Sequence, residues 1–343
     1  MRIMKPRPLR RRPSVSVVIP CYNYGHFLPA AVASALAQDG VDVEVIIVDD
    51  ASRDGSADVA RELAASDARI VAILHESNAG HIKTYNDGLA RATGEYVSLL
   101  SADDLLCPGA LGRAAALFEA RPEVGLVYGF PVYFTGTPPE TRQRPTSWST
   151  WSGEAWLRIL ARRGRNPIIS PEAVLRRSVL ERIGPYAASL PHSADMALWM
   201  RAALVSHVGR VNGVDQAFYR VHEANMHATV HAGDLIDLEQ RQLAVDSVLP
   251  EGALRERAHV SLAREAIKVA VAGRRRGDLT SGDIVSLVSF ATAAWPAMRR
   301  STWRRRWELR WLDRELPGQQ PVAALRDALW WKYRWRRWRR FGT

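Results

Sequence analysis

The chain has 343 residues, of which 47% are hydrophobic, and its net charge is +11. This hydrophobic fraction excludes a disordered chain, and two cysteines in dissimilar contexts exclude a disulfide framework and a cysteine-based zinc site. Residues 1–12 hold six Lys or Arg and no acid, residues 298–343 hold fourteen against four acids, and the body between them is mildly acidic. The acidic body argues against nucleic-acid binding.

Residues 1–13 are expected to form a basic, flexible N-terminal tail. They do not resemble a secretory signal, because they lack its apolar core. The most apolar late stretch, residues 284–298, is too short and too polar to span a membrane. These features predict a cytoplasmic protein, with a peripheral position on the inner face of the plasma membrane as a further option.

Residues 14–130 alternate between strand-like and helix-like segments with short connections. Strands are predicted at 15–20, 43–48, 70–74, 95–100 and 124–128, and helices at 28–38, 56–65, 82–92 and 109–120. This alternation predicts an α/β fold with a mostly parallel, doubly wound sheet. Right-handed crossovers would place the flanking helices on both faces of the sheet.

The later part of the chain is less regular. Residues 131–145 are rich in Pro, Thr and Gly and predict a loop, and an edge strand is expected near 217–221. From residue 235 onward the pattern is helical. We therefore expect one domain over 14–235, made of the halves 14–130 and 131–235, followed by a helical, basic C-terminal appendage over 236–343.

Two pairs of adjacent aspartates, Asp49-Asp50 and Asp103-Asp104, directly follow predicted strands. Neighbouring carboxylates repel each other, and a protein core does not bury them without compensation. At the carboxyl ends of parallel strands they would face the crevice where open α/β sheets bind ligands. This favours a site for a nucleotide and a hard cation such as Mg²⁺ or Mn²⁺. The alternative is a pair of solvated acids that open a loop or cap a helix.

Several short motifs occur in a fixed order along residues 14–230. They are Pro20-Cys21-Tyr22-Asn23-Tyr24, Asp49-Asp50-Ala51-Ser52-Arg53-Asp54-Gly55-Ser56, Asn78-Ala79-Gly80, Asn86-Asp87-Gly88, Ser101-Ala102-Asp103-Asp104, Ala194-Asp195-Met196-Ala197-Leu198-Trp199-Met200-Arg201 and Tyr219-Arg220-Val221-His222. Together they closely resemble the inverting glycosyltransferases of family 2, which have the GT-A fold. The resemblance implies a nucleotide-sugar-binding half over 14–130 and an acceptor half over 131–235.

In this resemblance the first two motifs would hold the nucleotide. Asp50 would accept the imide N–H of uracil, and Pro20, Tyr22 and Asn23 would frame the base. The Tyr22 ring offers a stacking surface, although simple packing of that ring is an equal alternative. Lys83 is a basic residue near the expected phosphate positions, as are Arg53 and Arg220, for each of which a solvated surface role is the alternative.

The motif from Ser101 to Asp104 implies the metal and diphosphate site. Asp103 matches the last acid of the family's Asp-x-Asp signature, whose first position here is Ser101, and Ala102 lies between them. Asp104 would reach the ribose or orient Asp103. His222 is expected as a further ligand of the Mg²⁺ or Mn²⁺ ion. A zinc site that joins it to two later histidines is disfavoured, because the spacing matches no structural zinc pattern.

The acidic motif of the acceptor half implies the catalytic base. Asp195 would remove the proton of the acceptor hydroxyl while its oxygen attacks the anomeric carbon from the face opposite the leaving diphosphate. The alternative for Asp195 is an N-cap of the helix that follows. Family members usually carry a Glu before this acid, where this chain has Ala194.

The C-terminal region combines tryptophan and arginine at helical spacing. Trp303, Trp307 and Trp311 share one helix face, Trp335 and the residues around it repeat the pattern, and basic residues fill the remaining positions. This is typical of interfacial helices on anionic membranes. Packing on the catalytic domain or in a homodimer is the first alternative, and nucleic-acid binding is a weaker one.

The sequence thus predicts an inverting, metal-assisted transferase that moves a sugar from a nucleotide-sugar donor, with UDP as the favoured nucleotide, to a glycan or lipid-linked acceptor in cell-surface polysaccharide or glycoconjugate synthesis. Two alternatives remain open. One is a sugar-phosphate nucleotidyltransferase, although the first loop lacks the Gly-rich basic sequence expected of that class. The other is a non-catalytic, membrane-associated binding protein with the same fold.

Overall fold

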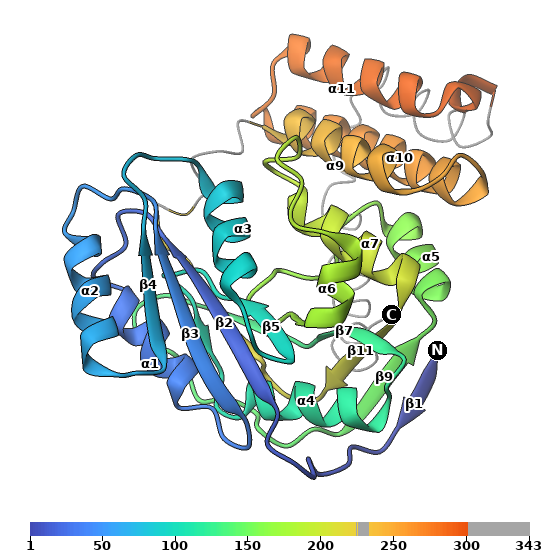
Figure 1. Ribbon diagram of the computed structural model, residues 1–343. Coiled ribbons are helices and arrows are strands. Elements are labelled where there is room, and N and C mark those ends of the chain that lie inside the picture. The colour runs from blue at the N-terminus through green and yellow to red at the C-terminus, as the bar shows by residue number, and fades with distance from the viewer. Residues whose placement is uncertain (224, 226–232, 301–343) are drawn as a thin grey trace. The chain divides into compact units, whose positions relative to one another are not determined.

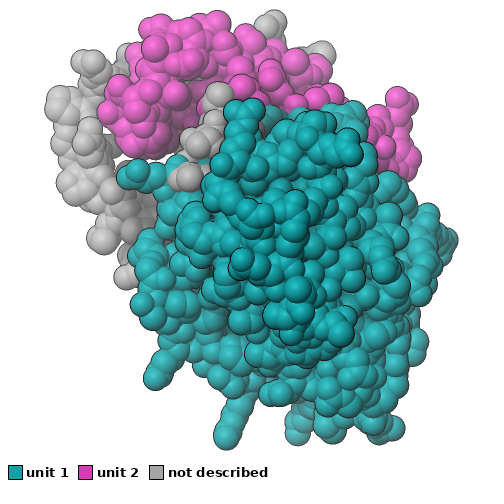
Figure 2. Space-filling view, turned by 60° about the vertical axis from the view of Figure 1, so that its left-hand side comes forward, with its two compact units in different colours: residues 1–157, 167–225, 342 teal, residues 158–166, 226–341, 343 magenta. Residues whose placement is uncertain are grey.

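A computed structural model describes residues 1–223, 225 and 233–300 of the chain. The chain divides into two compact units, coloured separately in Figure 2. Unit 1 contains residues 1–157 and 167–225, and unit 2 contains residues 158–166 and, among the described residues, 233–300. The predictions made for the Trp- and Arg-rich stripes and for His227 and His231 lie outside the described residues.

Unit 1 is built on a nine-stranded sheet in the order β1-β9-β11-β7-β10-β5-β2-β3-β4. Its strands are β1 (Arg2–Met4), β2 (Ser14–Cys21), β3 (Asp42–Asp49), β4 (Ile70–Leu74), β5 (Tyr96–Leu99), β7 (Val124–Tyr128), β9 (Ser147–Trp151), β10 (Val174–Arg176) and β11 (His207–Asn212). The strands β5, β2, β3 and β4 are parallel neighbours (Figure 1), as the alternation predicts. β10 runs antiparallel between β5 and β7.

Helices cover both faces of the parallel strands. α1 (Leu28–Leu36), α2 (Ser56–Ser66) and α4 (Ala110–Ala120) pack with Val15, Val17 and Ile19, the alternate residues of β2, in one buried apolar core. α3 (His81–Arg91) packs on the other face, where Gly88 lies against Val18 and Val48. Successive strand residues point to opposite faces, so β2 contributes to both layers. The predicted doubly wound arrangement is confirmed.

Three expectations about local structure are wrong. Residues 2–4, expected in a flexible tail, form β1 and pair with β9. The predicted loop over 131–145 begins with β8 (Pro131–Phe134), and the predicted edge strand is β12 (Ala217–Arg220). β12 is the central strand of a small sheet, because it pairs with both β8 and β6 (Leu105–Leu106). These strands are short and pair with distant segments, so local periodicity does not reveal them.

The remaining elements are helical. They are α5 (Gly153–Arg163), α6 (Arg177–Ile183), α7 (Ala194–Val205), α9 (Asp234–Val248), α10 (Ala253–Arg276), α11 (Ser281–Ala294) and a final 3₁₀ turn (Pro296–Arg300). Unit 2 has its own apolar core, which includes Leu238, Leu262, Ile267, Leu287 and Met298. The helical pattern predicted from residue 235 is confirmed for the described residues. None of the helices among them is long and apolar enough to cross a membrane.

Candidate active site

The loop after β5 carries two buried carboxyl groups on consecutive residues. Asp103 is 7% exposed and Asp104 is 2% exposed. The Asp104 amide donates to Ser101 O at 3.0 Å, which closes a tight turn. Burial raises the pKa of Asp104 well above its usual range, and the neighbouring Asp103 charge raises it further. The raised pKa favours the protonated form of Asp104, which reduces the repulsion within the pair.

Arg220 of β12 fastens this loop to the small sheet. Its amide donates to Asp104 Oδ1 at 2.9 Å, and its guanidinium donates to Asp103 O at 2.8 Å. The guanidinium also lies over the rings of Phe27 and Phe134, at 4.6 and 4.5 Å from their centroids. These contacts are within the protein, so the alternative of a solvated surface role for Arg220 is wrong. The hydrogen bond described for the Asp104 carboxyl group is likewise made within the protein, with the Arg220 amide.

His222 and Asp103, the two residues predicted to bind a metal, lie together. His222 Nε2 is 3.1 Å from Asp103 Oδ2, although 119 residues separate them in the sequence. The His222 ring packs against Tyr24 and Phe27, with centroids 5.6 and 5.3 Å away. A carboxylate oxygen and an imidazole nitrogen this close together could both bind one divalent cation, whose other ligands would come from a diphosphate and water. Within the described residues no group of three or more His, Cys, Asp or Glu could hold such an ion.

Asp50, at the end of β3, is held by a compact hydrogen-bond network. The amides of Ala79 and Gly80 donate to its two oxygens at 2.8 and 2.9 Å, and His75 Nδ1 lies 2.8 Å from Oδ1. Burial alone would raise the pKa of Asp50, but these hydrogen bonds hold it below its usual value. A carboxylate accepts about four hydrogen bonds, so one more partner can still bind.

The loops after β2 and β3 are tied together beside Asp50. Ser52 donates its hydroxyl to Asp49 Oδ1 at 2.5 Å and accepts the Asn23 amide at 2.9 Å. Asn23 and Ala51 have φ angles of 59° and 56°, which non-glycine residues seldom adopt. The exposed Tyr22 ring lies next to Asn23 in the first of these loops. Pro20 lies inside β2, opposite Val48, rather than in the loop.

Asp195 lies in the first turn of α7. The helix begins at Ala194 with Ser193 at its N-cap position, so the alternative that Asp195 is the cap is wrong. Its carboxylate accepts the Met196 amide at 2.6 Å and the Ser170 hydroxyl at 3.2 Å. The side chain is thus fixed from two segments of the acceptor half.

Tyr85 of α3 shows that the separate carboxyl groups converge. Burial raises the pKa of Tyr85, and the negative charges of Asp195, Asp103 and Asp104 raise it further, in that order. All three acids therefore lie within electrostatic range of one phenol. The Tyr186 ring packs edge-on against Tyr85 at 5.4 Å. Neither tyrosine was expected from the sequence: Tyr85 does not stand out from the core pattern of its amphipathic helix, and Tyr186 lies in the connection between α6 and α7.

Glu172 is a further carboxyl group of this region that the sequence did not single out. It is 2% exposed, and burial raises its pKa to about 7, with a contribution from the charge of Asp195. The Ile169 amide donates to its Oε1 at 2.8 Å. It precedes β10 by two residues, in a segment without a recognisable period.

Lys83 and Ala102 complete the predicted set. Lys83 is exposed on α3 and pairs with Asp87 at 2.5 Å, and the same Asp87 lies 2.9 Å from His75 Nε2. Ala102 is 1% exposed, and its side chain belongs to the buried apolar core of unit 1. Contacts of these two residues with a donor remain predictions.

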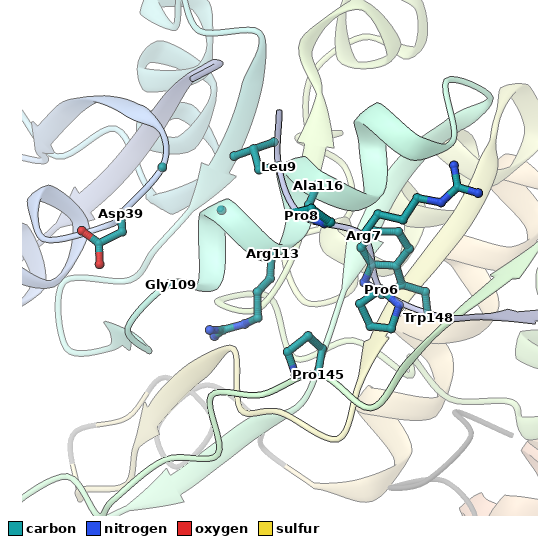
Figure 3. Close-up of a pocket in the computed structure, with 12 residues that line it drawn as sticks. Pro6, Arg7, Pro8, Leu9, Asp39, Gly109, Arg113, Ala116, Pro145 and Trp148 are labelled. Atoms are coloured by element: carbon teal, nitrogen blue, oxygen red, sulfur yellow. The ribbon is translucent and has the colours of Figure 1, made fainter. Parts of the chain in front are cut away.

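A pocket of about 310 Å³ lies elsewhere in unit 1 (Figure 3). Its lining includes Pro6, Leu9, Arg113 and Trp148, together with Asp39 shortly before β3. The candidate site instead uses residues that follow β3 and β5. The pocket is therefore at the other end of the parallel strands and is separate from the carboxyl groups described above.

Comparisons with known proteins show the family and the fold. An uncharacterised glycosyltransferase of Nostoc sp. is 30% identical over 220 residues, which cover 62% of this chain and 66% of that protein, slightly less than two thirds of its length. Staphylococcus aureus TarS (residues 1–349), solved in complex with UDP-GlcNAc, superposes with a TM-score of 0.61 at 18% identity, covering 82% of this chain and 80% of that one.

A mannosyltransferase of Pyrobaculum calidifontis, solved with GDP-Man and Mn²⁺, gives a TM-score of 0.58 at 21% identity and covers 98% of this chain and 85% of that one. At these identities the solved structures establish the fold. The family model described as glycosyl transferase family 2 matches residues 16–184, which include both aspartate pairs. The chain belongs to glycosyltransferase family 2 and has the GT-A fold.

Proposed function

We propose that this protein transfers a sugar from a nucleotide-sugar donor, with UDP as the favoured nucleotide, to a hydroxyl group of a glycan or lipid-linked acceptor in cell-surface polysaccharide or glycoconjugate synthesis. The observation that carries the proposal is the convergence of Asp103 and Asp195 on Tyr85, with His222 beside Asp103. Sugar transfer from a diphosphate requires two kinds of group close together: ligands for a metal ion, here Asp103 and His222, and a separate carboxylate that acts as the base, here Asp195. The nucleotide sugars in the two solved relatives support a donor of this class.

The nucleotide would bind at the loops after β2 and β3. Asp50 is ionised and has one acceptor position left, so it can accept the imide N–H of a uracil base. Tyr22, in the loop after β2, is 43% exposed and offers a ring for stacking. The hydrogen bonds of Asn23 with Ser52 and Arg53 fix the shape of the loop before the base arrives.

Asp103 and His222 would hold the divalent cation. When bound, Mg²⁺ or Mn²⁺ stabilises the negative charge that develops on the departing diphosphate. The Asp104 carboxyl group keeps the loop attached to β12, because it accepts the Arg220 amide. The pairing of Asp103 with His222 orients both side chains in advance.

Asp195 would act as the base. The oxygen of the acceptor hydroxyl attacks the anomeric carbon, Asp195 takes the hydroxyl proton, and the bond between that carbon and the diphosphate oxygen breaks. The nucleoside diphosphate leaves from the face opposite the attack, so the configuration inverts. The hydrogen bond from Ser170 directs one Asp195 oxygen and leaves lone pairs for the acceptor.

The test uses the full-length protein with UDP- and GDP-sugars, with Mn²⁺ or EDTA, and measures nucleoside diphosphate release. We expect release with one donor, its loss in EDTA, and a 10²- to 10⁴-fold lower kcat in Asp195→Asn with an unchanged Kd for the donor. Asp58→Asn is the matched control, because Asp58 is exposed on α2 and pairs only with Arg61 among the described contacts. Pyrophosphate release would instead indicate a nucleotidyltransferase, and no turnover of any donor would indicate a binding protein.

A further inference from the structure

A tight turn at residues 169–173 lies next to Asp195. The Ala173 amide donates to Ser170 O at 2.9 Å, and Ser98 of β5 donates its hydroxyl to Ala173 O at 2.9 Å. The turn is therefore closed on itself and attached to the central sheet. It thus bonds both to β5 and, through Ser170, to the Asp195 carboxylate.

Ser170 occupies a backbone conformation that L-residues rarely adopt. Its φ is 105°, and it precedes Pro171, which normally restricts the preceding residue to extended conformations with negative φ. Such strain persists only where surrounding contacts enforce it, often at functional sites. Here the strained residue donates the 3.2 Å hydrogen bond to Asp195 Oδ2.

Glu172, two residues later, lies within electrostatic range of Asp195. Its Oε1 accepts the Ile169 amide within the turn, whereas Oε2 is buried without a hydrogen-bond partner among the described residues. An unpaired buried carboxyl oxygen is costly and calls for an explanation. The charged or titratable groups that act on it are Arg210 of β11 and Asp195 of α7. It acts in turn on Asp104 and on Tyr133 of β8.

We propose that this turn is the positioning element of the candidate base: Ser170 orients the Asp195 carboxylate, and the buried Glu172 carboxyl group sets its affinity for a proton. The inference rests on the proposed function, since Asp195 is the base of that reaction. Ser170 and Glu172 are positioning residues, because both act through Asp195.

The electrostatic part has a defined direction. Two carboxylates that interact in a buried site titrate as a pair, and each negative charge raises the proton affinity of the other. Glu172 ionises near neutral pH, since burial raises its pKa to about 7. Once Glu172 is ionised, Asp195 becomes a stronger base. The fully buried Arg210 keeps the pair from becoming uncompensated negative charge.

The first experiment compares Ser170→Gly with Ser170→Ala in the full-length protein. Glycine adopts a φ of 105° freely, so Ser170→Gly should keep or raise the melting temperature while it removes the hydroxyl group. We expect both variants to lower kcat about tenfold or more, with the KM for the donor unchanged. A wild-type kcat in Ser170→Gly would overturn the role of Ser170. A loss of kcat in Ser170→Ala alone would assign the effect to backbone strain and would overturn it as well.

The second experiment records the pH profile of kcat/KM for the acceptor in the wild type and in Glu172→Gln. Glutamine keeps the shape and the acceptor for the Ile169 amide but cannot ionise. We expect the wild-type profile to rise between about pH 6 and 8 and the variant profile to lack this step, with donor KM unchanged. Identical profiles in a folded variant would overturn the role of Glu172. The wild-type turnover is the internal reference: active wild type with unaffected variants refutes this inference alone, whereas an inactive wild type refutes the proposed function and the inference with it.

Discussion

Three acids of unit 1 show how the surroundings of a residue decide its chemistry. Asp50 is buried but accepts two backbone amides that hold its pKa below the usual value, whereas burial and the neighbouring Asp103 raise the pKa of Asp104. Glu172 titrates near neutral pH. The same functional group thus serves as an ionised hydrogen-bond acceptor, as a buried structural contact and as a titratable neighbour of the candidate base.

The raised pKa of Glu172 predicts a pH-dependent stability. Unfolded, this group titrates near 4.5, and folded near 7, so between these values the native state holds a proton that the unfolded state has lost. The free energy of unfolding therefore falls as pH rises through this window, by up to about 3 kcal/mol. Glu172→Gln should lack this contribution. Urea denaturation of both proteins at pH 5 and pH 8 measures it, and an equal pH dependence of the two would contradict the assignment.

Asp103 and His222 predict how the protein responds to metal. With Mn²⁺ and UDP at about 100 times their Kd, the wild type should gain about 2.7 kcal/mol of stability by mass action. Asp103→Asn should lose most of this gain and His222→Gln part of it, because each removes one of the two paired ligands. Thermal-shift assays with and without Mn²⁺ measure the gain, and Asp58→Asn should keep it. A full metal-dependent shift in Asp103→Asn would place the ion elsewhere.

At the scale of elements, α3 links the sheet to the site. Gly88 allows one face of the helix to approach β2 and β3, since a Cβ there would lie 2.3 Å from Val18 Cγ1 and 3.0 Å from Val48 Cγ2. Tyr85 of the same helix lies within range of Asp195 and Asp103. The distance between α3 and the sheet therefore also sets where Tyr85 stands relative to the acids.

Gly88→Ala should destabilise unit 1 and lower activity together. The added methyl group overpacks the contact between α3 and the sheet, at a cost of about 1 to 3 kcal/mol. Gly282→Ala is the matched control in α11, where the nearest atom is Thr280 Oγ1 at 3.6 Å and alanine should gain up to about 1 kcal/mol. Denaturant midpoints and nucleoside diphosphate release report both effects. Equal midpoints for Gly88→Ala and the wild type would show that α3 can shift freely.

The central fold was predictable because its signals are local. β4 and β7 match their predicted ranges, since both are apolar runs bounded by turns, and Asp50 directly follows β3. β8, β10 and β12 were missed or misplaced because they are short and stabilised by pairing with distant segments. The same applies to the site: Asp103 and Asp195 belong to recognisable motifs, whereas Ser170, Glu172 and Tyr85 acquire their roles only through burial and neighbours.

At the scale of the whole chain, the concentration of positive charge beyond residue 298 leads to a membrane prediction. We expect the full-length protein to float with anionic liposomes and a chain that ends at residue 300 to remain in solution, since each basic residue near such a surface contributes about 1 kcal/mol. Ending at residue 300 retains Met298 in the core of unit 2. Neutral liposomes and high salt are the controls. Equal flotation of both chains would assign the basic segment another role.

The position of β10 in the sheet has a consequence for synthesis. Residues 174–176 fill the place between β5 and β7, whose own residues leave the ribosome 50 to 80 residues earlier. Until then β5 is an open edge with unsatisfied backbone groups, the kind of surface that pairs with other nascent chains. A fragment that ends near residue 130 would retain that edge permanently and should aggregate. We therefore expect that residues 14–130 do not fold autonomously, because their sheet is completed by residues 174–176.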